Sequence, residues 1–422
     1  IDGKIGYSID GKLEISNDNR GNTVALSMPI TTASLGDSDF CKTYHVSAAY
    51  YAGGMANAIA SEDLVIALGK SKLMGCFGSG GLSLDRITTA IDTIQSELNN
   101  APYMFNLLHN PFEPNIEQRT VELFLEKRVP VIEAAAYINL THALVQYRVT
   151  GLSQDDSGNI QIKNHIIAKI SRKEVAQRFL QPPPEKILQT LISDGKITQT
   201  QANIARQVPM ADDITVEADS GGHTDNQPLV SLLPSIIALR DQSQVRYQFK
   251  HPVRIGAAGG ISTPRAVLGA YMMGAAYVVT GSINQACIES GASNHTKNLL
   301  AQAEMADVTM APSADMFEMG VKVQVLKRGT LFPVRAAKLY EIYSRYNSLE
   351  EIPENETKNI EKNFFKCGLQ EEWHRTKSFF QQRDPRQIKL AESKPKHKMA
   401  LIFRSYLGRS SFWAISGDSD RK

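Results

Sequence analysis

The chain has 422 residues and a formal net charge of +2, with 42% hydrophobic and 21% charged residues. This length accommodates one large domain and a smaller one, and the composition is ordinary for a globular protein. The small net charge argues against a nucleic acid or a polybasic membrane role, and no apolar run approaches the roughly 20 residues of a membrane span.

Residues 1–43 are expected to form an N-terminal extension, in which GYSIDGKLEIS predicts a small hairpin. From residue 44 onward, strand-like segments alternate with segments that have the 3.6-residue period of an amphipathic helix. The first four strand-like segments are HVSAAYYAGG, KLMGCFGSGG, APYMFNLLHN and VPVIEAAAY.

The fifth unit carries two predicted insertions. A polar hairpin is expected at about 148–163, before the strand HIIAKIS, and two short helices at about 181–207, after a proline cluster. The sixth strand is predicted at residues 214–216, a β-branched run typical of a strand that is covered on both faces. VRIGAAGG and AAYVVTGS give the seventh and eighth strands.

Eight successive strand–helix units within residues 44–292 predict an α/β fold, a (β/α)8 TIM barrel with insertions. A doubly wound open sheet is the structural alternative, but it needs about five or six strands and one switch point. Beyond about residue 293 the alternation stops, and from residue 334 only helical patterns remain. Residues 293–422 are therefore expected to form a connecting loop and a C-terminal helical subdomain on the substrate side.

Glycine-rich turns end the seventh and eighth strands, at Gly259, Gly260, Gly281 and Ser282. The active site of a TIM barrel lies at this end of the strands, and the last two loops are the usual place for a phosphate. Glycine turns suit an anion because they free backbone N–H groups to face it. We therefore expect a phosphorylated substrate or cofactor here, and flavin mononucleotide (FMN) is favoured. The alternative is that both loops are only tight turns.

The first two loops are also rich in glycine, at Gly53, Gly54 and residues 78–81, and are expected to leave room for the planar flavin ring. Asn106 in the third strand and Lys169 at the end of the fifth are candidates for contact with the polar edge of the ring. A lysine there would stabilise an anionic reduced flavin by charge pairing. A lysine that only extends to solvent from a strand end is the alternative.

The sixth strand runs into Gly221 and Gly222 and then presents His223. Two adjacent glycines allow the backbone to pass close to a flat ligand, and an imidazole beyond them can stack, donate or accept a proton near neutral pH. A hairpin turn with a surface histidine is the alternative for this stretch.

The four cysteines, Cys41, Cys76, Cys287 and Cys367, lie far apart and include no CxxC pair. This usage fits reduced thiols of a cytoplasmic protein and predicts no metal site. The chain begins at Ile1, with neither an initiator methionine nor a signal peptide. We therefore expect a domain cut from a longer polypeptide.

Several long segments resemble the PfaD-type enoyl reductases of polyunsaturated fatty acid synthases and trans-acyltransferase polyketide synthases. These reductases are part of the nitronate monooxygenase-like flavin barrels. The resemblance covers residues 36–413 and is most specific over residues 211–333. The segments that carry it are GGMANAIAS, NLLHNPFEP, IAKISR, ADDITVEADSGGHTDNQP, GAAGGI, YVVTGSINQ, ADVTMAPSADMFEMGVKVQVLKRGTLFP and KHKMALIFRSYLG.

The resemblance implies an FMN-dependent reduction of 2-enoyl thioesters with NADPH, on substrates tethered to an acyl carrier protein. A fused or neighbouring acyltransferase is a further implied partner. His223 is the implied catalytic residue, and Lys169 is expected to tune the flavin; His109, Tyr137 and Lys322 are weaker candidates. The residues expected to bind the cofactor are Gly53, Gly54, Met55, Asn106, Lys169, Gly221, Gly222, Gly259, Gly260, Gly281 and Ser282.

Two other functions are weighed against this one. A nitronate monooxygenase would share the fold and the flavin, but many of these enzymes have glutamine in the sixth strand where this chain has Val216. A non-catalytic scaffold that docks carrier proteins would not need intact glycine loops. For docking of an acidic carrier protein, residues 322–335 are the expected surface.

Overall fold

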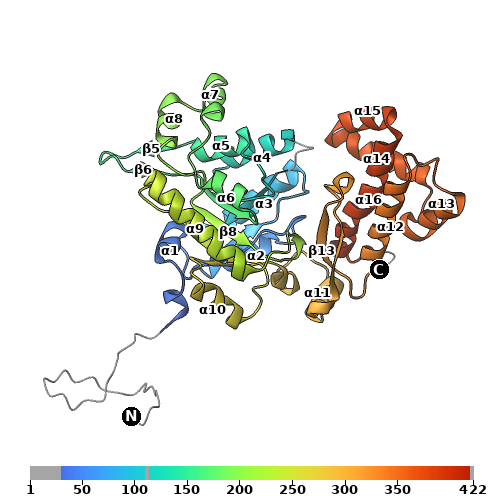
Figure 1. Ribbon diagram of the computed structural model, residues 1–422, viewed down its shortest axis with the longest axis horizontal. Helices are drawn as coiled ribbons and strands as arrows, with labels where there is room; N and C mark the ends of the chain where they lie inside the picture. Colours follow the sequence, from blue (N-terminus) through green and yellow to red (C-terminus); the bar gives the residue numbers. More distant parts are fainter. Residues whose placement is uncertain (1–29, 110–113, 419–422) are drawn as a thin grey trace, which may run out of the picture.

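The computed structural model describes residues 30–109 and 114–418, so the hairpin expected near the N-terminus lies outside the described residues. Eight parallel strands close into a barrel, which confirms the predicted fold (Figure 1). Around the barrel, each strand is hydrogen-bonded to the next in the order β1, β11, β10, β8, β7, β4, β3, β2. The strands are β1 (Tyr50–Ala52), β2 (Met74–Phe77), β3 (Met104–Leu108), β4 (Val131–Ala135), β7 (His165–Ile170), β8 (Asp213–Glu217), β10 (Arg254–Ala258) and β11 (Val278–Thr280).

Helices cover the outside of the barrel, and their apolar faces form one large buried cluster with the outward-facing strand residues. Polar side chains begin several of these helices: Ser61, Ser83 and Thr141 each accept a hydrogen bond from a backbone amide of the first turn. The helices are α2 (Glu62–Lys70), α3 (Leu84–Leu98), α4 (Pro114–Glu126), α5 (His142–Val149), α6 (Lys173–Phe179), α9 (Leu229–Tyr247) and α10 (Pro264–Met272).

Three further segments are attached to the barrel. Helix α1 (Ser38–Tyr44) packs at the N-terminal ends of the strands, where Phe40 stacks on Tyr277 at 4.4 Å between ring centroids. The region expected to hold a hairpin contains β5 (Ser153–Gln154) and β6 (Ile160–Gln161), and the region expected to hold two helices contains α7 (Glu185–Ser193) and α8 (Gln199–Ala205).

The residues expected to be a connecting loop instead contain helix α11 (Asn294–Ala301) and a β-hairpin. Strands β12 (Val308–Pro312) and β13 (Lys322–Leu326) pair antiparallel, and β13 also pairs with β9 (Gly222–His223), which follows barrel strand β8. The result is a second sheet, of three strands, between the barrel and the C-terminal helices (Figure 1). The alternation of Val321, Val323 and Val325 is a local signal for β13.

The C-terminal helices form a body of their own beside the barrel (Figure 1). Their buried cluster is rich in aromatic residues, among them Phe317, Phe365, Phe403 and Tyr406, and it is separate from the barrel core. No helix in the described ranges is long and apolar enough to cross a membrane. The helices are α12 (Phe332–Arg345), α13 (Glu354–Ile360), a π-helical turn (Glu361–Phe365), α14 (Leu369–Arg383), α15 (Pro385–Ser393) and α16 (Pro395–Ser416).

Candidate active site

A buried carboxylate, Glu133, lies at the centre of the barrel interior. It is 0% exposed, and it accepts hydrogen bonds from the Tyr51 hydroxyl at 3.1 Å, the Gly54 amide at 3.2 Å and Asn106 Nδ2 at 3.0 Å. The barrel brings these groups together because Asn106 and Glu133 are partners in the register of β3 and β4. Glu133 was not among the expected site residues, although a carboxylate inside the apolar strand VPVIEAAAY was a visible signal.

Glu133 fixes the orientation of Asn106, one of the residues expected to contact the cofactor. Asn106 Nδ2 donates to both the backbone carbonyl and the carboxylate of Glu133, so Oδ1 faces the second glycine loop. A Cβ on Gly80 would lie 3.7 Å from this Oδ1 atom. Asn106 therefore offers a hydrogen-bond acceptor, not a donor, toward that loop.

Lys169 lies near two carboxylates, and its Nζ is 3.4 Å from Glu217 Oε1. Burial opposes the charge of Lys169, but the negative charges of Glu133 and Glu217 outweigh this effect and raise its pKa above the ordinary value. The side chain is 18% exposed. The lysine is therefore a fixed positive charge at the end of β7, held in place by carboxylates.

Successive side chains of β8 point alternately into the barrel and toward the surrounding helices. Thr215 faces the barrel interior, where its hydroxyl bonds the hydroxyls of Tyr51 and Tyr277, both at 2.9 Å. Val216 belongs to the buried cluster between strands and helices, so it faces away from the site. The side chain near the site is that of the next residue, Glu217.

The glycines of the first two loops are needed for packing within the protein. A Cβ on Gly54 would lie 2.8 Å from Asn106 Cβ, and a Cβ on Gly78 would overlap the carbonyl oxygen of Met55. A Cβ on Gly53 would lie 3.1 Å from a methyl group of Val279. Protein atoms therefore occupy the Cβ direction of these three glycines. Contact of Gly53, Gly54 and Met55 with a cofactor stays a prediction.

The loops after β10 and β11 are open. No protein atom lies within 4 Å of a Cβ built on Gly260 or Gly281, whereas a Cβ on Gly259 would meet the Ala218 carbonyl at 2.8 Å. Gly259 and Gly260 have φ angles of +89° and +68°, which favour glycine. The backbone amides of Gly260, Ile261, Ser282 and Ile283 have no acceptor among the described residues. These amides form an open group of donors suited to an anion.

Gly221 approaches the same region. A Cβ on Gly221 would lie 2.5 Å from Ser282 Oγ, so the loop after β8 passes close to the loop after β11. Asp219 holds the loop after β8 in shape, because its Oδ1 accepts hydrogen bonds from Asn226 at 2.8 Å and from Gln324 at 3.1 Å. No protein atom lies within 4 Å of a Cβ on Gly222.

His223 lies on β9, where it pairs with Val323 of β13. Its Nε2 is 3.2 Å from Oδ1 of Asp315, and the two side chains are 40% and 36% exposed. Burial opposes protonation of the imidazole, but the hydrogen bond and charge of Asp315 and the charge of Glu217 outweigh it and raise the pKa of His223. Asp315 was missed because its partner is 92 positions away in the chain.

The weaker candidates lie in different surroundings. His109 Nδ1 is 2.6 Å from Glu117 Oε2, and the His109 ring stacks on Tyr137 at 5.1 Å. The Tyr137 hydroxyl donates to Glu117 Oε1 at 3.0 Å, and burial together with the Glu117 charge raises the pKa of Tyr137 well above its ordinary value. Lys322 is exposed at the start of β13 and has no ion-pair partner among the described residues. His109 and Tyr137 are therefore held by Glu117, whereas Lys322 is free to meet a partner.

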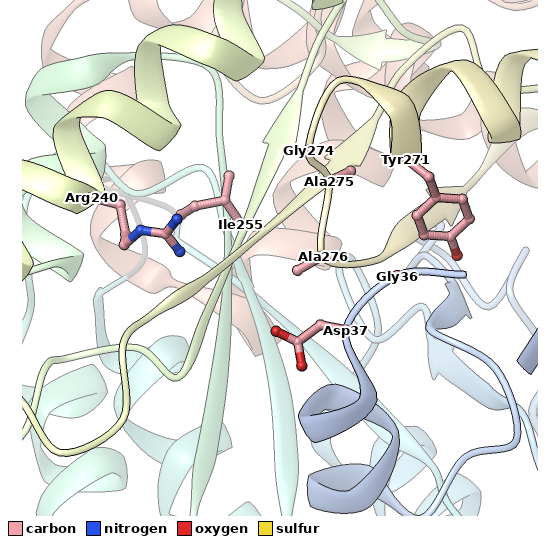
Figure 2. Close-up of a pocket in the computed structure, with 8 residues that line it drawn as sticks. All are labelled: Gly36, Asp37, Arg240, Ile255, Tyr271, Gly274, Ala275 and Ala276. Atoms are coloured by element: carbon pink, nitrogen blue, oxygen red, sulfur yellow. The ribbon is translucent and has the colours of Figure 1, made fainter. Parts of the chain in front are cut away.

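A hollow of about 320 Å³ lies at the opposite end of the barrel. Figure 2 shows it where α1, α10 and the N-terminal part of β10 meet, with the Asp37 carboxylate directed into it. Its lining residues are Gly36, Asp37, Arg240, Ile255, Tyr271, Gly274, Ala275 and Ala276. None of these is an expected site residue. No group of three or more metal-binding side chains occurs in the described parts of the chain.

Two known protein families match this chain, over segments that overlap. Residues 38–374 match the nitronate monooxygenase family, and residues 346–422 match the inserted helical domain of acyl-carrier-protein S-malonyltransferase. The chain is 49% identical over 415 residues to a polyunsaturated fatty acid synthase polypeptide of Thraustochytrium sp., and 45% identical over 394 residues to the polyketide biosynthesis protein PksE of Bacillus subtilis. These alignments cover 97% and 93% of this chain but only 28% and 51% of the two relatives.

A solved structure is similar over nearly its whole length. It is the enoyl reductase domain of MlnA, from the macrolactin biosynthesis cluster of Bacillus amyloliquefaciens. The two structures align with a TM-score of 0.88 and 39% sequence identity, over 93% of this chain and 88% of that chain. The alignment is too long to be confined to the barrel, so the C-terminal helical region is part of the similarity.

Proposed function

The chain belongs to the nitronate monooxygenase family, and we propose that within it the protein is an FMN-dependent enoyl reductase of polyketide or polyunsaturated fatty acid biosynthesis. The observation that carries this proposal is the similarity to the MlnA enoyl reductase domain, because it extends over 93% of this chain at 39% identity. The polyketide and fatty acid synthase relatives support the same pathway class.

The residues present fit FMN. The open amides after β10 and β11 suit its phosphate, and a Cβ on Gly260 or Gly281 would enter this space. Asn106 Oδ1 can accept a hydrogen bond from an N–H group of the ring, and Lys169 supplies a positive charge on the same side of the barrel. When bound, FMN would accept hydride equivalents from NADPH and deliver them to Cβ of the enoyl thioester.

His223 supplies the proton in this proposal. Its Nε2 is engaged by Asp315, which leaves Nδ1 to hold the proton that goes to Cα of the substrate. The raised pKa of His223 keeps the imidazole protonated to a higher pH than an ordinary histidine. A charged imidazole also stabilises the negative charge that develops on the thioester oxygen.

Lys169 contributes charge and not a proton. Because Glu133 and Glu217 raise its pKa, it stays positive throughout the neutral range. A positive charge beside the cofactor stabilises additional negative charge on that cofactor. The paired carboxylates limit this effect, since they already balance part of the lysine charge.

The proposed partner is an acyl carrier protein. Residues 346–422 match a helical domain of an acyl-carrier-protein acyltransferase, and the exposed Lys322, Lys327 and Arg328 lie on or next to β13, which pairs with the strand of His223. Basic residues near the entrance of the site would attract an acidic carrier. A fused or neighbouring acyltransferase remains part of the proposal, since the synthase relatives are longer than this chain.

A nitronate monooxygenase is the second candidate, because the matched family carries that name. The long similarity to an enoyl reductase domain that shares the C-terminal helices favours reduction of a carrier-bound substrate instead. A scaffold without activity is disfavoured by the open amide group, which has no use in a docking module. The first test is to purify the protein and measure its visible absorbance: bound FMN that loses colour with NADPH is expected, and a colourless protein that does not take up added FMN would contradict the proposal.

A further inference from the structure

The turn that carries Asp315 is held by the C-terminal helices and not by the barrel. It lies between β12 and β13 and contains a single helical turn, Phe317–Met319. Phe317 is 0% exposed and contacts Tyr340, Tyr343 and Phe403 edge-on or tilted, at 5.2 to 6.4 Å between ring centroids. The turn is therefore anchored at one end in the aromatic cluster of the helical body.

Helix α16 supplies a second, polar anchor. Arg404 Nε donates to the carbonyl oxygen of Ala314 at 2.9 Å, and Arg404 Nη1 lies 3.6 Å from Glu318 Oε1. His397 Nδ1, on the same helix, is 3.2 Å from the same Glu318 oxygen. The hydrogen bond from His397, together with the charge of Arg404, lowers the pKa of Glu318, so the carboxylate stays charged.

These contacts bracket Asp315. Arg404 holds the carbonyl of the residue before it and the side chain of Glu318 after it. The Asp315 carboxylate itself bonds His223, on the barrel side of the turn, at 3.2 Å. An arginine can hold two acceptors at once because its donors form a rigid fork, whereas a lysine holds them less well.

We propose that Arg404 is a positioning residue of the reaction: by holding Ala314 and Glu318, it fixes the distance between Asp315 and His223. In this role Arg404 acts through its contacts with the turn and needs no contact with the substrate. The C-terminal helical body is then part of the catalytic apparatus as well as a surface for a partner. The catalytic consequence rests on the proposed function, but the effect on the Asp315–His223 pair does not.

The test measures the titration of His223 directly. NMR of protein labelled in its nine histidines would follow each imidazole with pH, with the His223 signal assigned by its loss in His223→Gln. The charged groups that face His223 are Asp315, Glu217 and Lys169, and replacing Arg404 changes none of these three residues, so a shift reports a change in their distance from His223. Arg404→Met should lower the pKa of His223 toward the value in Asp315→Asn, whereas Arg404→Lys should restore part of it.

Arg409 provides a matched control on the same helix. Its Nη2 is 2.5 Å from the buried Glu372, and it makes no contact with the Asp315 turn among the described residues. Arg409→Met should destabilise the helical body and leave the His223 titration unchanged. An unchanged titration in Arg404→Met, or an equal shift in both variants, would overturn the proposal.

A second variant and an activity measurement allow the proposal to be tested even if Arg404→Met does not fold. If Arg404→Met does not fold by circular dichroism, Glu318→Gln removes the charge that Arg404 and His397 share, and it should shift the His223 titration in the same direction but less. Reduction of the enoyl thioester should fall up to about 100-fold in Arg404→Met, as for other misplaced catalytic groups. A shifted titration in a protein that never reduces enoyl thioesters would contradict the proposed function and leave the positioning role intact.

Discussion

Nε2 of His223 and Oδ1 of Asp315 are 3.2 Å apart, although the two residues are 92 positions apart in the chain. His223 comes from the loop after barrel strand β8, and Asp315 from a turn held by the C-terminal helices. The pair therefore exists only when the barrel and the helical body are both folded. If the protein is the proposed enoyl reductase, the helices beyond the barrel contribute to its site through Asp315.

The first prediction concerns pH. Asp315 raises the pKa of His223, so the protonated imidazole persists to higher pH and is lost as the pH rises through the raised value. Asp315→Asn should therefore move the loss of enoyl reduction at high pH to a lower pH. The rate of flavin reduction by NADPH should keep its pH dependence. Identical pH profiles for the variant and the unaltered protein would show that Asp315 does not set the protonation of His223.

The second prediction concerns the phosphate. No protein atom lies within 4 Å of a Cβ on Gly281, so both Gly281→Ala and Gly281→Asp should fold. An aspartate would repel the phosphate by about 4 kcal/mol at contact distance in a partly buried site, which is roughly a 1,000-fold loss of affinity. Gly281→Ala adds a methyl group without charge, so it should weaken FMN binding much less than Gly281→Asp in fluorescence titrations. Stoichiometric FMN in purified Gly281→Asp would place the phosphate elsewhere.

The third prediction concerns Glu133. Replacing it with leucine removes the carboxylate that accepts hydrogen bonds from Tyr51, Gly54 and Asn106, and it leaves Lys169 without one of its two carboxylates. Glu133→Leu should destabilise the fold by about 3–5 kcal/mol, as for other broken buried charge networks. Glu133→Gln keeps one acceptor and should cost only about 1–2 kcal/mol. Thermal denaturation of the two variants measures the difference, and equal melting temperatures would contradict the assigned network.

The fourth prediction concerns the carrier protein. Lys327 and Arg328 are exposed next to β13, so Lys327→Glu/Arg328→Glu should raise the KM for a carrier-bound enoyl substrate, with kcat little changed. The KM for a small enoyl thioester should stay the same, which serves as the internal control. In the unaltered protein, the KM for the carrier-bound substrate should rise with salt, because salt screens exposed charges. A KM independent of salt would exclude an electrostatic dock on this surface.

The barrel could be predicted from the sequence because its signals are local. Each strand is a short apolar or β-branched run followed by a turn, and each helix follows within a few residues. The three-stranded sheet could not be predicted in this way. Strand β9 is only two residues long, and its partner β13 lies about 100 residues further along the chain, so no local pattern indicates the pairing.

The site was only partly visible for the same reason. Lys169 and His223 could be predicted as site residues because each lies at or just after the end of a strand and carries a chemically distinctive side chain. Glu133 has its role because β3 lies beside it when the barrel closes. Asp315 has its role because the packing of Phe317 in the helical body holds its turn near His223. The contact of Gly53 and Gly54 with the flavin ring stays a prediction; the protein atoms in the Cβ direction of these glycines could be located only in the packed structure.

The central claim is that the protein reduces enoyl thioesters, and the most direct test asks which compound accepts electrons from the reduced flavin. Protein reduced anaerobically with one equivalent of NADPH is mixed rapidly with an enoyl thioester, and the return of the oxidised flavin absorbance is recorded. Separately, the oxidised protein is mixed in air with a nitroalkane anion, which would be the electron donor, and oxygen consumption is recorded. The enoyl thioester should restore the absorbance and yield the saturated thioester, and His223→Ala should slow this step by roughly 10²–10⁴-fold while flavin reduction by NADPH stays close to normal. No return of absorbance with the enoyl thioester, together with oxygen consumption driven by the nitroalkane anion, would contradict the account.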